Sequence, residues 1–314
     1  MNPDNIIVFA GSASRQLTGR ICKHLKIKPG DNETLIFSEG NIFVRVNENV
    51  RGRRVYLVQS TAFPANDNFM ELLFWIDALK RASAESVTAI IPYFSYGKGD
   101  KKDEPRVSIR ARVCADAIEA AGADRVVTMD LHAPQIQGFF RIPVDNLYAL
   151  PALCDRIKKE KLKDIIIVSP DTGFAKQARK YSSALGTSVA IADKERVAHD
   201  EKATVLEIIG HVEGKTALIV DDFAISGGTL AGVAHELVAR GAKDVYAMVA
   251  HGVFGKDSMK RIDASPIKKF FVTDTVENQQ VKLSKKIEIV SVASLFAKAI
   301  ESIHNRESIS AMFP

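Results

Sequence analysis

The chain has 314 residues, 46% hydrophobic and 26% charged, which is enough to bury one large core or two of ordinary size. Its net charge of +5 suits anionic small molecules at least as readily as nucleic acid, and without a block of like charge we expect no nucleic-acid partner. The separated cysteines Cys22, Cys114 and Cys154 exclude a disulfide framework, and without a signal-peptide pattern or a membrane-spanning run we expect a cytoplasmic protein with no membrane partner.

Short runs rich in Val and Ile alternate with amphipathic stretches along the chain. The pattern predicts strands near residues 5–11, 53–60, 86–94, 125–132, 163–171, 188–193, 215–222, 244–252 and 268–274. It predicts helices near residues 69–82, 108–123, 173–185 and 228–242, with Trp75 in the core. Strand and helix in repeated alternation are typical of an α/β fold, in which helices cover a mostly parallel sheet.

The two halves of the chain resemble each other weakly. The segment AIEAAGADRVVTMDLH, residues 117–132, is echoed by ELVARGAKDVYAMVAHG, residues 236–252: each reads as a helix, a glycine turn and a strand followed by histidine. Prolines interrupt the pattern between residues 142 and 153. We therefore predict two related domains, residues 1–147 and 148–314.

One strand end carries unusual chemistry. The predicted strand 215–222 ends in Asp221 and Asp222, and Ser226–Thr229 then precedes a helix. Ligands of open parallel sheets bind beyond the carboxyl ends of strands, and glycines there let backbone N–H groups converge on a phosphate. Carboxylates repel a phosphate, so they suit sugar hydroxyls or a bridging cation. The segment predicts a site for a phosphorylated sugar, although two acids that cap a simple turn remain an alternative.

The segment LIVDDFAISGGTL resembles the phosphoribosyl diphosphate loop of type I phosphoribosyltransferases and of ribose-phosphate pyrophosphokinases. MDLHAPQIQGFF, VSPDTGFAKQAR, DKERV and SVASLFAKAIESIHNRESIS resemble the pyrophosphokinases, and the resemblance runs from about residue 7 onward. That family transfers the diphosphoryl group of ATP to the anomeric hydroxyl of ribose 5-phosphate, with magnesium required. The resemblance implies two type I phosphoribosyltransferase-like domains, each a mostly parallel sheet covered by helices.

The resemblance assigns metal and sugar residues. Asp130 and His132 stand two apart at a strand end, so both side chains can approach one cation, and the resemblance implies Mg2+ there. It places Asp171 at the metal and at the ribose 5-phosphate site, although an N-cap role alone explains an aspartate before a helix. The other implied ribose 5-phosphate residues are Asp221, Asp222, Ser226, Gly227, Gly228 and Thr229.

The charged segment DKERVAHDEK, residues 193–202, reads by itself as a solvated loop. In the family the matching loop is mobile and carries a lysine and an arginine over the transferring phosphoryl group. Lys194 and Arg196 stand at those positions, where cations would stabilise the charge that develops in the transition state. The resemblance therefore implies that they are catalytic.

The implied nucleotide residues depart from the family pattern. Phe37 and Glu39 match positions that approach adenine from a neighbouring subunit, which implies a homo-oligomer with a shared site. Asn41 replaces the usual Glu, and YGKGD replaces YARQD, so Lys98 and Gly99 stand where Arg and Gln usually contact ATP, beside Asp100 and His132. We expect altered nucleotide selectivity, with ATP or another diphosphoryl donor as substrate.

Three points stay open at this level. Ile225 replaces a third acid of the sugar-phosphate loop, which puts affinity for ribose 5-phosphate in doubt. Two alternatives to the synthetase remain: a phosphoribosyltransferase or related phosphoribosyl diphosphate-binding enzyme, and a nonenzymatic regulatory homologue. One branch of the family is regulated by nucleoside diphosphate and phosphate, and part of that site resembles Arg51, Lys102, Ser308 and Ser310, where a solvated surface is an equally good interpretation.

Overall fold

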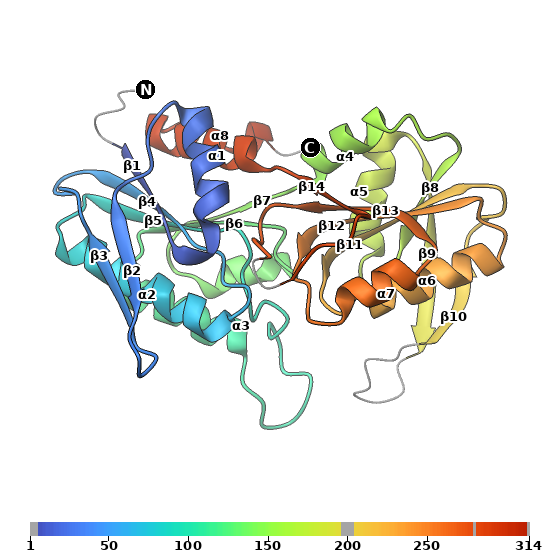
Figure 1. Ribbon diagram of the computed structural model, residues 1–314, viewed down its shortest axis with the longest axis horizontal. Helices are drawn as coiled ribbons and strands as arrows, with labels where there is room; N and C mark the ends of the chain where they lie inside the picture. The colour runs from blue at the N-terminus through green and yellow to red at the C-terminus, as the bar shows by residue number, and fades with distance from the viewer. Residues whose placement is uncertain (1–5, 196–203, 279–280, 313–314) are drawn as a thin grey trace. The chain divides into compact units, whose positions relative to one another are not determined.

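The computed structural model describes residues 6–195, 204–278 and 281–312 (Figure 1). The chain divides into two compact units. The first unit contains the chain up to Tyr148, the short segment Thr275–Glu277 and the chain from Ser291 onward; the second contains Ala149–Asp274 and Asn278–Val290.

The first unit is built on a five-stranded parallel sheet. Its strands, in spatial order, are β1 (Ile6–Ala10), β4 (Arg54–Val58), β5 (Ser86–Ile91), β6 (Arg125–Met129) and β7 (Val144–Leu147). Helices α1 (Arg15–Leu25) and α8 (Ala293–Asn305) cover one face, and α2 (Ala65–Arg81) and α3 (Arg110–Ala121) cover the other (Figure 1). The core lies between them, where the rings of Phe9 and Trp75 stack with centroids 6.3 Å apart and Trp75 is fully buried, as predicted.

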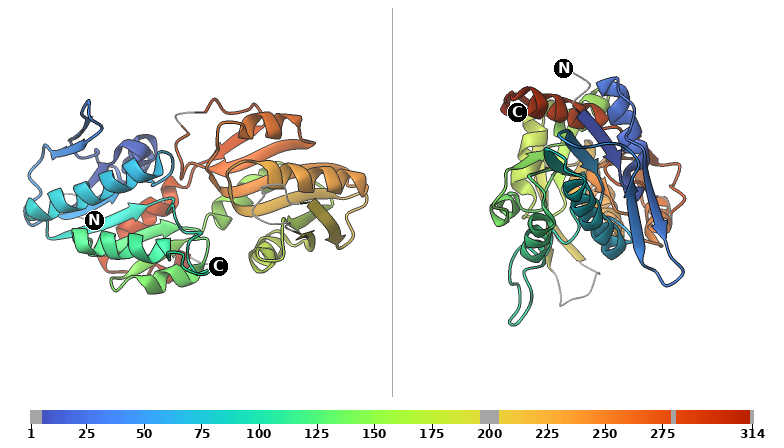
Figure 2. Two further views of the ribbon diagram at one scale, coloured as in Figure 1. Left: turned by 90° about the horizontal axis from the view of Figure 1, so that it is seen from below. Right: turned by 90° about the vertical axis from the view of Figure 1, so that its left-hand side faces the viewer.

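A separate antiparallel hairpin also belongs to the first unit. Strands β2 (Asn32–Ile36) and β3 (Ile42–Val46) pair with each other, and β3 packs on α2. The hairpin extends past α2, as Figures 1 and 2 show. Its tip therefore reaches beyond the unit's own layers. Short 3-10 turns at Ser12–Ser14, Pro134–Phe139 and Ser310–Met312 complete the unit.

The second unit has a seven-stranded sheet. Its strands, in spatial order, are β10 (Thr204–Ile209), β9 (Ser188–Glu195), β8 (Ile165–Ser169), β11 (Thr216–Ala224), β12 (Asp244–Gly252), β13 (Ile267–Thr273) and β14 (Ile287–Val290). Strand β10 pairs antiparallel with β9, and the other neighbours pair in parallel. Its helices are α4 (Leu150–Lys159), α5 (Ala175–Leu185), α6 (Gly228–Ala239) and α7 (Ser258–Ala264). The predicted α/β class, with mostly parallel sheets and covering helices, is confirmed.

The division of the chain differs from the predicted domains 1–147 and 148–314 at the C-terminus. The chain from Ser291 onward belongs to the first unit, because α8 packs on α1 and the two helices bury Ile21 and Phe296 completely. Arg54 Nη1 of β4 also donates a hydrogen bond to the carbonyl oxygen of His304, at 3.1 Å. The apolar face of α8 fits a helix packed on either sheet, so the sequence alone did not indicate which unit it joins.

Candidate active site

Asp130 sits at the carboxyl end of β6 in a constrained turn. Its φ is 41°, in the left-handed region, and its backbone nitrogen donates to the carbonyl of Leu147 at 2.9 Å. The next nitrogen, of Leu131, donates to Asn146 Oδ1 at 3.1 Å. Burial and then the charge of Asp130 raise the pKa of Tyr148. Pairing with the β7 segment therefore fixes the direction in which the carboxylate leaves the strand.

His132 lies beside the loop that follows β5. A methyl group built on Gly97 would lie 3.8 Å from His132 Cβ, and the imidazole is exposed. The structure thus brings the YGKGD loop and the Asp130–His132 turn together at one edge of the sheet. The described residues contain no group of three or more His, Cys, Asp or Glu side chains arranged for a metal. A magnesium ion at Asp130 and His132 would take its other ligands from water and phosphate oxygens, which is the usual habit of this ion.

The YGKGD loop is fastened to the first turn of α3. The backbone nitrogen of Gly99 donates to the carbonyl of Tyr96 at 2.8 Å, and the nitrogen of Ala111 donates to the carbonyl of Gly99 at 3.1 Å. Lys98 is exposed, Asp100 is half-buried and Gly99 is buried. Within this short loop, Lys98 is therefore more accessible to a ligand than Asp100, and Gly99 is the least accessible.

The hairpin tip carries the remaining residues predicted to bind nucleotide. Phe37 is 47% exposed, with its ring 6.0 Å from that of Phe43. Asn41 Nδ2 donates a hydrogen bond to Glu39 Oε1 at 3.2 Å. Asn41, which stands where the family pattern has Glu, therefore positions the carboxylate of Glu39. An exposed aromatic ring beside a carboxylate suits stacking on a base with hydrogen bonds at its edge.

Asp221 and Asp222 follow each other in β11 of the second unit, and Asp171 follows the neighbouring strand β8. Burial, then the charge of Asp222, and more weakly that of Asp171, raise the pKa of Asp221 well above its ordinary value. Strand β11 continues past both acids to Ala224, further than the predicted end at residue 222. Neighbouring carboxylates that repel one another are suited to sugar hydroxyls, which donate hydrogen bonds to them.

Asp171 does not cap the next helix directly. Helix α5 begins at Ala175, with Phe174 at its N-cap position, and Asp171 Oδ1 accepts a hydrogen bond from the backbone nitrogen of Phe174 at 3.0 Å. The predicted N-cap role is therefore replaced by a hydrogen bond that closes the turn preceding the helix. This bond holds the carboxylate at the strand end, near Asp221.

The loop Ser226–Thr229 leads into α6 as predicted. Gly227 is the N-cap with φ +71°, a conformation that favours glycine, and a methyl group there would lie 3.2 Å from the side chain of Ile262. Ser226 Oγ accepts a hydrogen bond from the nitrogen of Gly228 at 3.3 Å. The helix start therefore offers backbone N–H groups and a hydroxyl of the kind that bind phosphate.

Arg261 of α7 is a residue of this site that sequence reasoning missed. Its Nη1 donates to the carbonyl of Ser226 at 3.3 Å, which places a guanidinium beside the glycine loop. Arg261 is far from Ser226 along the chain and lies in no recognised motif. Only the fold indicates the pairing.

The predicted catalytic loop is described only at its edge. The backbone of Lys194 belongs to β9 and pairs with Val205 of β10. Arg196 lies outside the described residues, so the catalytic role of both cations stays a prediction.

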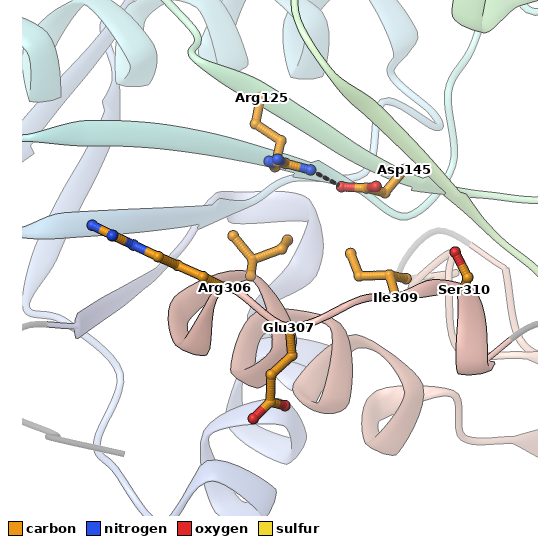
Figure 3. A pocket seen from close by; sticks show the side chains of 7 residues that line it. Arg125, Asp145, Arg306, Glu307, Ile309 and Ser310 are labelled. Carbon is orange, nitrogen blue, oxygen red and sulfur yellow. Dashed lines mark hydrogen bonds and ion pairs between the residues drawn. The ribbon is translucent and has the colours of Figure 1, made fainter.

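A cavity of about 380 Å³ lies within the first unit (Figure 3). Its lining comprises Arg125, Asp145, Ile303, Arg306, Glu307, Ile309 and Ser310. Arg125 begins β6 and forms an ion pair with Asp145, whereas Asp130 follows the other end of that strand. The cavity is therefore at the opposite edge of the sheet from Asp130 and His132. Of the four residues with a resemblance to a regulatory site, its lining includes Ser310.

Comparison with known proteins gives a consistent result along the whole chain. Residues 6–122 match the family model for the N-terminal domain of ribose phosphate pyrophosphokinase, and residues 194–314 match that for the phosphoribosyl synthetase-associated domain. The ribose-phosphate pyrophosphokinase of Caldanaerobacter subterraneus subsp. tengcongensis is 45% identical over 311 residues, which cover 99% of this chain and 98% of the relative. The protein of that name from Rhizobium meliloti is 44% identical over 308 residues, covering 98% and 99%.

A solved structure agrees with the sequence relatives. The phosphoribosylpyrophosphate synthetase from Mycobacterium smegmatis matches with a TM-score of 0.90 at 37% identity, covering 96% of this chain and 99% of that one.

In the part of the chain that the structure describes, no helix is both long and apolar enough to cross a membrane.

Proposed function

This chain belongs to the ribose-phosphate pyrophosphokinase family, and we propose that it transfers the diphosphoryl group of ATP to the anomeric hydroxyl of ribose 5-phosphate, giving 5-phosphoribosyl 1-diphosphate and AMP. The observation that carries this proposal is full-length identity of 45% to a named family member, in a chain that keeps the Asp130–His132 turn and the acid–glycine loop.

Ribose 5-phosphate binds in the second unit. The carboxylates of Asp221 and Asp222 accept hydrogen bonds from the ribose hydroxyls. The backbone N–H groups and hydroxyls of Ser226–Thr229 bind the 5-phosphate at the start of α6, where the helix dipole favours negative charge. Ile225 supplies no third carboxylate there, so we expect the sugar phosphate to bind more weakly than it would with an acid at this position.

Asp130 and His132 are the proposed magnesium residues of the first unit, and Asp171 is the proposed magnesium residue of the second. When bound, magnesium neutralises phosphate charge and orients the donor phosphates. The constrained φ of Asp130 and the hydrogen bonds around it support this role, because they hold one carboxylate in a fixed direction. His132 also lies beside the loop of Lys98 and Gly99, which we propose to contact the donor.

The reaction needs no covalent enzyme intermediate. The anomeric oxygen attacks the β-phosphorus of the donor in line and its hydroxyl proton is released to solvent; the bond between the β-phosphorus and the oxygen that bridges to the α-phosphorus breaks, and AMP leaves with that oxygen. Lys194 and Arg196 stabilise the charge that builds on the transferring group, and a loop that carries them also excludes water. Positioning and electrostatics therefore supply most of the rate enhancement.

The working protein is proposed to be a cytoplasmic homo-oligomer. Phe37 and Glu39 lie on a hairpin that extends past its own unit, which supports donation of these residues to the donor site of a neighbouring copy. The three cysteines are buried and unpaired, and burial raises the pKa of the Cys114 thiol to about 11, a state suited to a reducing compartment.

The test is AMP release by the purified chain with ribose 5-phosphate and Mg2+. We expect AMP from ATP only when ribose 5-phosphate is present, and loss of this AMP release in Asp222→Asn. Asp257→Asn, which removes an exposed acid before α7, is the matched control and should keep full activity. Release of pyrophosphate that depends on a nucleobase would support a phosphoribosyltransferase, whereas inactivity with every donor would support the regulatory homologue.

A further inference from the structure

The side chain of Arg110 fills the volume next to the Cα atom of Gly99. A methyl group built on Gly99 would lie 2.5 Å from Arg110 Nε, 2.8 Å from Arg110 Cβ and 3.3 Å from Arg110 Cζ. Gly99 is not among the glycines with positive φ, so its backbone does not require glycine. The position needs glycine because the Arg110 side chain fills the volume into which any residue 99 side chain would grow.

Arg110 is held in that place by the backbone around it. It is the first residue of α3, and the next nitrogen, of Ala111, donates to the carbonyl of Gly99 at 3.1 Å. Movement of the arginine backbone away from the loop would break this bond. The Arg110 side chain is therefore a built part of the YGKGD loop's surface, although it comes from a different element.

The charge of Arg110 is not neutralised by a neighbour. The side chain is exposed, and within residues 6–195, 204–278 and 281–312 it forms no ion pair. Arg112, two residues further along α3, differs: it forms an ion pair with Asp116 at 2.7 Å and donates a hydrogen bond to the carbonyl of Phe139. The Arg112 guanidinium is thus bound to groups of the protein itself, while the Arg110 guanidinium can bind an anion.

We propose that Arg110 binds the phosphates of the diphosphoryl donor, and that the Gly99–Arg110 pair determines donor selectivity. The proposal rests on the proposed function, because it takes the YGKGD loop as the donor loop. A guanidinium binds phosphate through paired charge-assisted hydrogen bonds, whereas the ammonium of Lys98 offers a single point of charge. A donor site that relies on these two cations recognises the polyphosphate more than the base. We therefore expect weak discrimination between nucleoside triphosphates.

The first test measures ATP binding by calorimetry in the presence of Mg2+, which needs no turnover. A charge-assisted hydrogen bond to phosphate is worth about 1.5–3 kcal/mol, so Arg110→Ala should raise the Kd for ATP about 10- to 150-fold. Ribose 5-phosphate should bind with an unchanged Kd, and Arg110→Lys should fall between. The matched control is Arg81→Ala, which removes an exposed guanidinium from the last turn of α2, where it pairs with Asp77.

The second test separates this role from a structural one. Gly99→Gln alone forces a side chain into the volume of Arg110 and should lower the Tm, whereas Gly99→Gln combined with Arg110→Ala should restore it and make ATP preferred over GTP and CTP. An equal Kd for ATP in wild type and Arg110→Ala overturns the inference, as does a Gly99→Gln variant that is as stable as wild type. Absence of AMP release by the wild type would instead contradict the proposed function. The ATP Kd values would still test whether Arg110 binds phosphate, because they need no turnover.

Discussion

The indole nitrogen of Trp75 donates a hydrogen bond to Glu71 Oε1 at 3.1 Å, one turn earlier on α2. The same buried carboxyl group accepts hydrogen bonds from Ser12 N at 2.9 Å, Thr34 Oγ1 at 3.0 Å and Gln59 Nε2 at 3.0 Å. These partners come from the loop after β1, from β2 and from the end of β4. One side chain therefore joins the β2–β3 hairpin to the ends of β1 and β4 and to α2.

Replacement of Glu71 should destabilise the first unit strongly. Glu71→Ala leaves several buried donors without an acceptor, at about 1–3 kcal/mol for each, so we expect a loss of at least about 3 kcal/mol in the free energy of unfolding. Glu71→Gln keeps one acceptor oxygen and should lose less. Thermal unfolding checks both, with the half-exposed Glu85 as control, since Glu85→Ala removes only a surface ion pair with Arg54. Equal Tm values for the two alanine variants would contradict this role.

Asp130→Asn should separate metal binding from folding. Asparagine tolerates the left-handed backbone at this position, so we expect an unchanged Tm. The Mg2+ concentration for half-maximal AMP release should rise at least about ten-fold, the scale of loss seen even when an indirect contact to a metal is removed. Asp116→Asn, an exposed acid of α3 paired with Arg112, is the control. A magnesium requirement equal to that of wild type would exclude Asp130 from the metal site.

The loop cations should act on turnover and leave substrate affinity nearly intact. Loss of one group that stabilises a transition state typically lowers turnover by about 100- to 1000-fold, so Lys194→Ala with Arg196→Ala should lose at least the lower figure. The Kd for ribose 5-phosphate, measured by calorimetry, should stay within about two-fold if the loop contacts only the transferring group. Lys202→Ala, a cation of the same segment, is the control. A small effect on turnover would remove the loop from the mechanism.

His304 should make the first unit less stable in mild acid. Burial, and then the charge of Arg54, lower its pKa below the ordinary 6.5. Between the lowered pKa of the folded state and the ordinary pKa of 6.5, the unfolded chain binds more protons than the folded chain. The stabilising effect of neutral His304 is therefore fully present above pH 6.5 and is lost as the pH falls toward the folded-state pKa. Between about pH 7.5 and about pH 5.5 the Tm of the wild type should fall more than that of His304→Gln. His24→Gln, at an exposed histidine of α1, should follow the wild type; a parallel fall in all three proteins would contradict the assignment.

The sequence predicted the elements that are buried on both sides. A central parallel strand such as β8 reads as a continuous apolar run, and the acids near the end of β11 and the glycines at the start of α6 stand out against such runs. The β2–β3 hairpin escaped prediction because each of its strands mixes polar and apolar residues and is only half-buried. Strand β7 escaped because prolines on either side of it indicated a boundary.

Partners that are distant along the chain could not be predicted. Asp130 and His132 lie two residues apart, so a local rule places them on one face. No local rule connects Gly99 with Arg110, Ser226 with Arg261, or Glu71 with Thr34, because each pair depends on how separate elements pack. The same reason separates α8, which sequence order assigned to the second domain, from the unit that it completes.

The return of α8 to α1 has a consequence for the order in which the protein matures during translation. The five strands of the parallel sheet in the first unit are all synthesised before residue 148, yet the face that α8 covers stays open until the ribosome has produced the entire second unit. Nascent domains generally begin to fold as they emerge, at about 5–20 residues per second. After the sheet is complete, Ile21 and its neighbours on α1 therefore stay uncovered while roughly half the chain is synthesised, about 8–30 seconds at that rate, and we expect them to be the part of the nascent chain that chaperones contact longest.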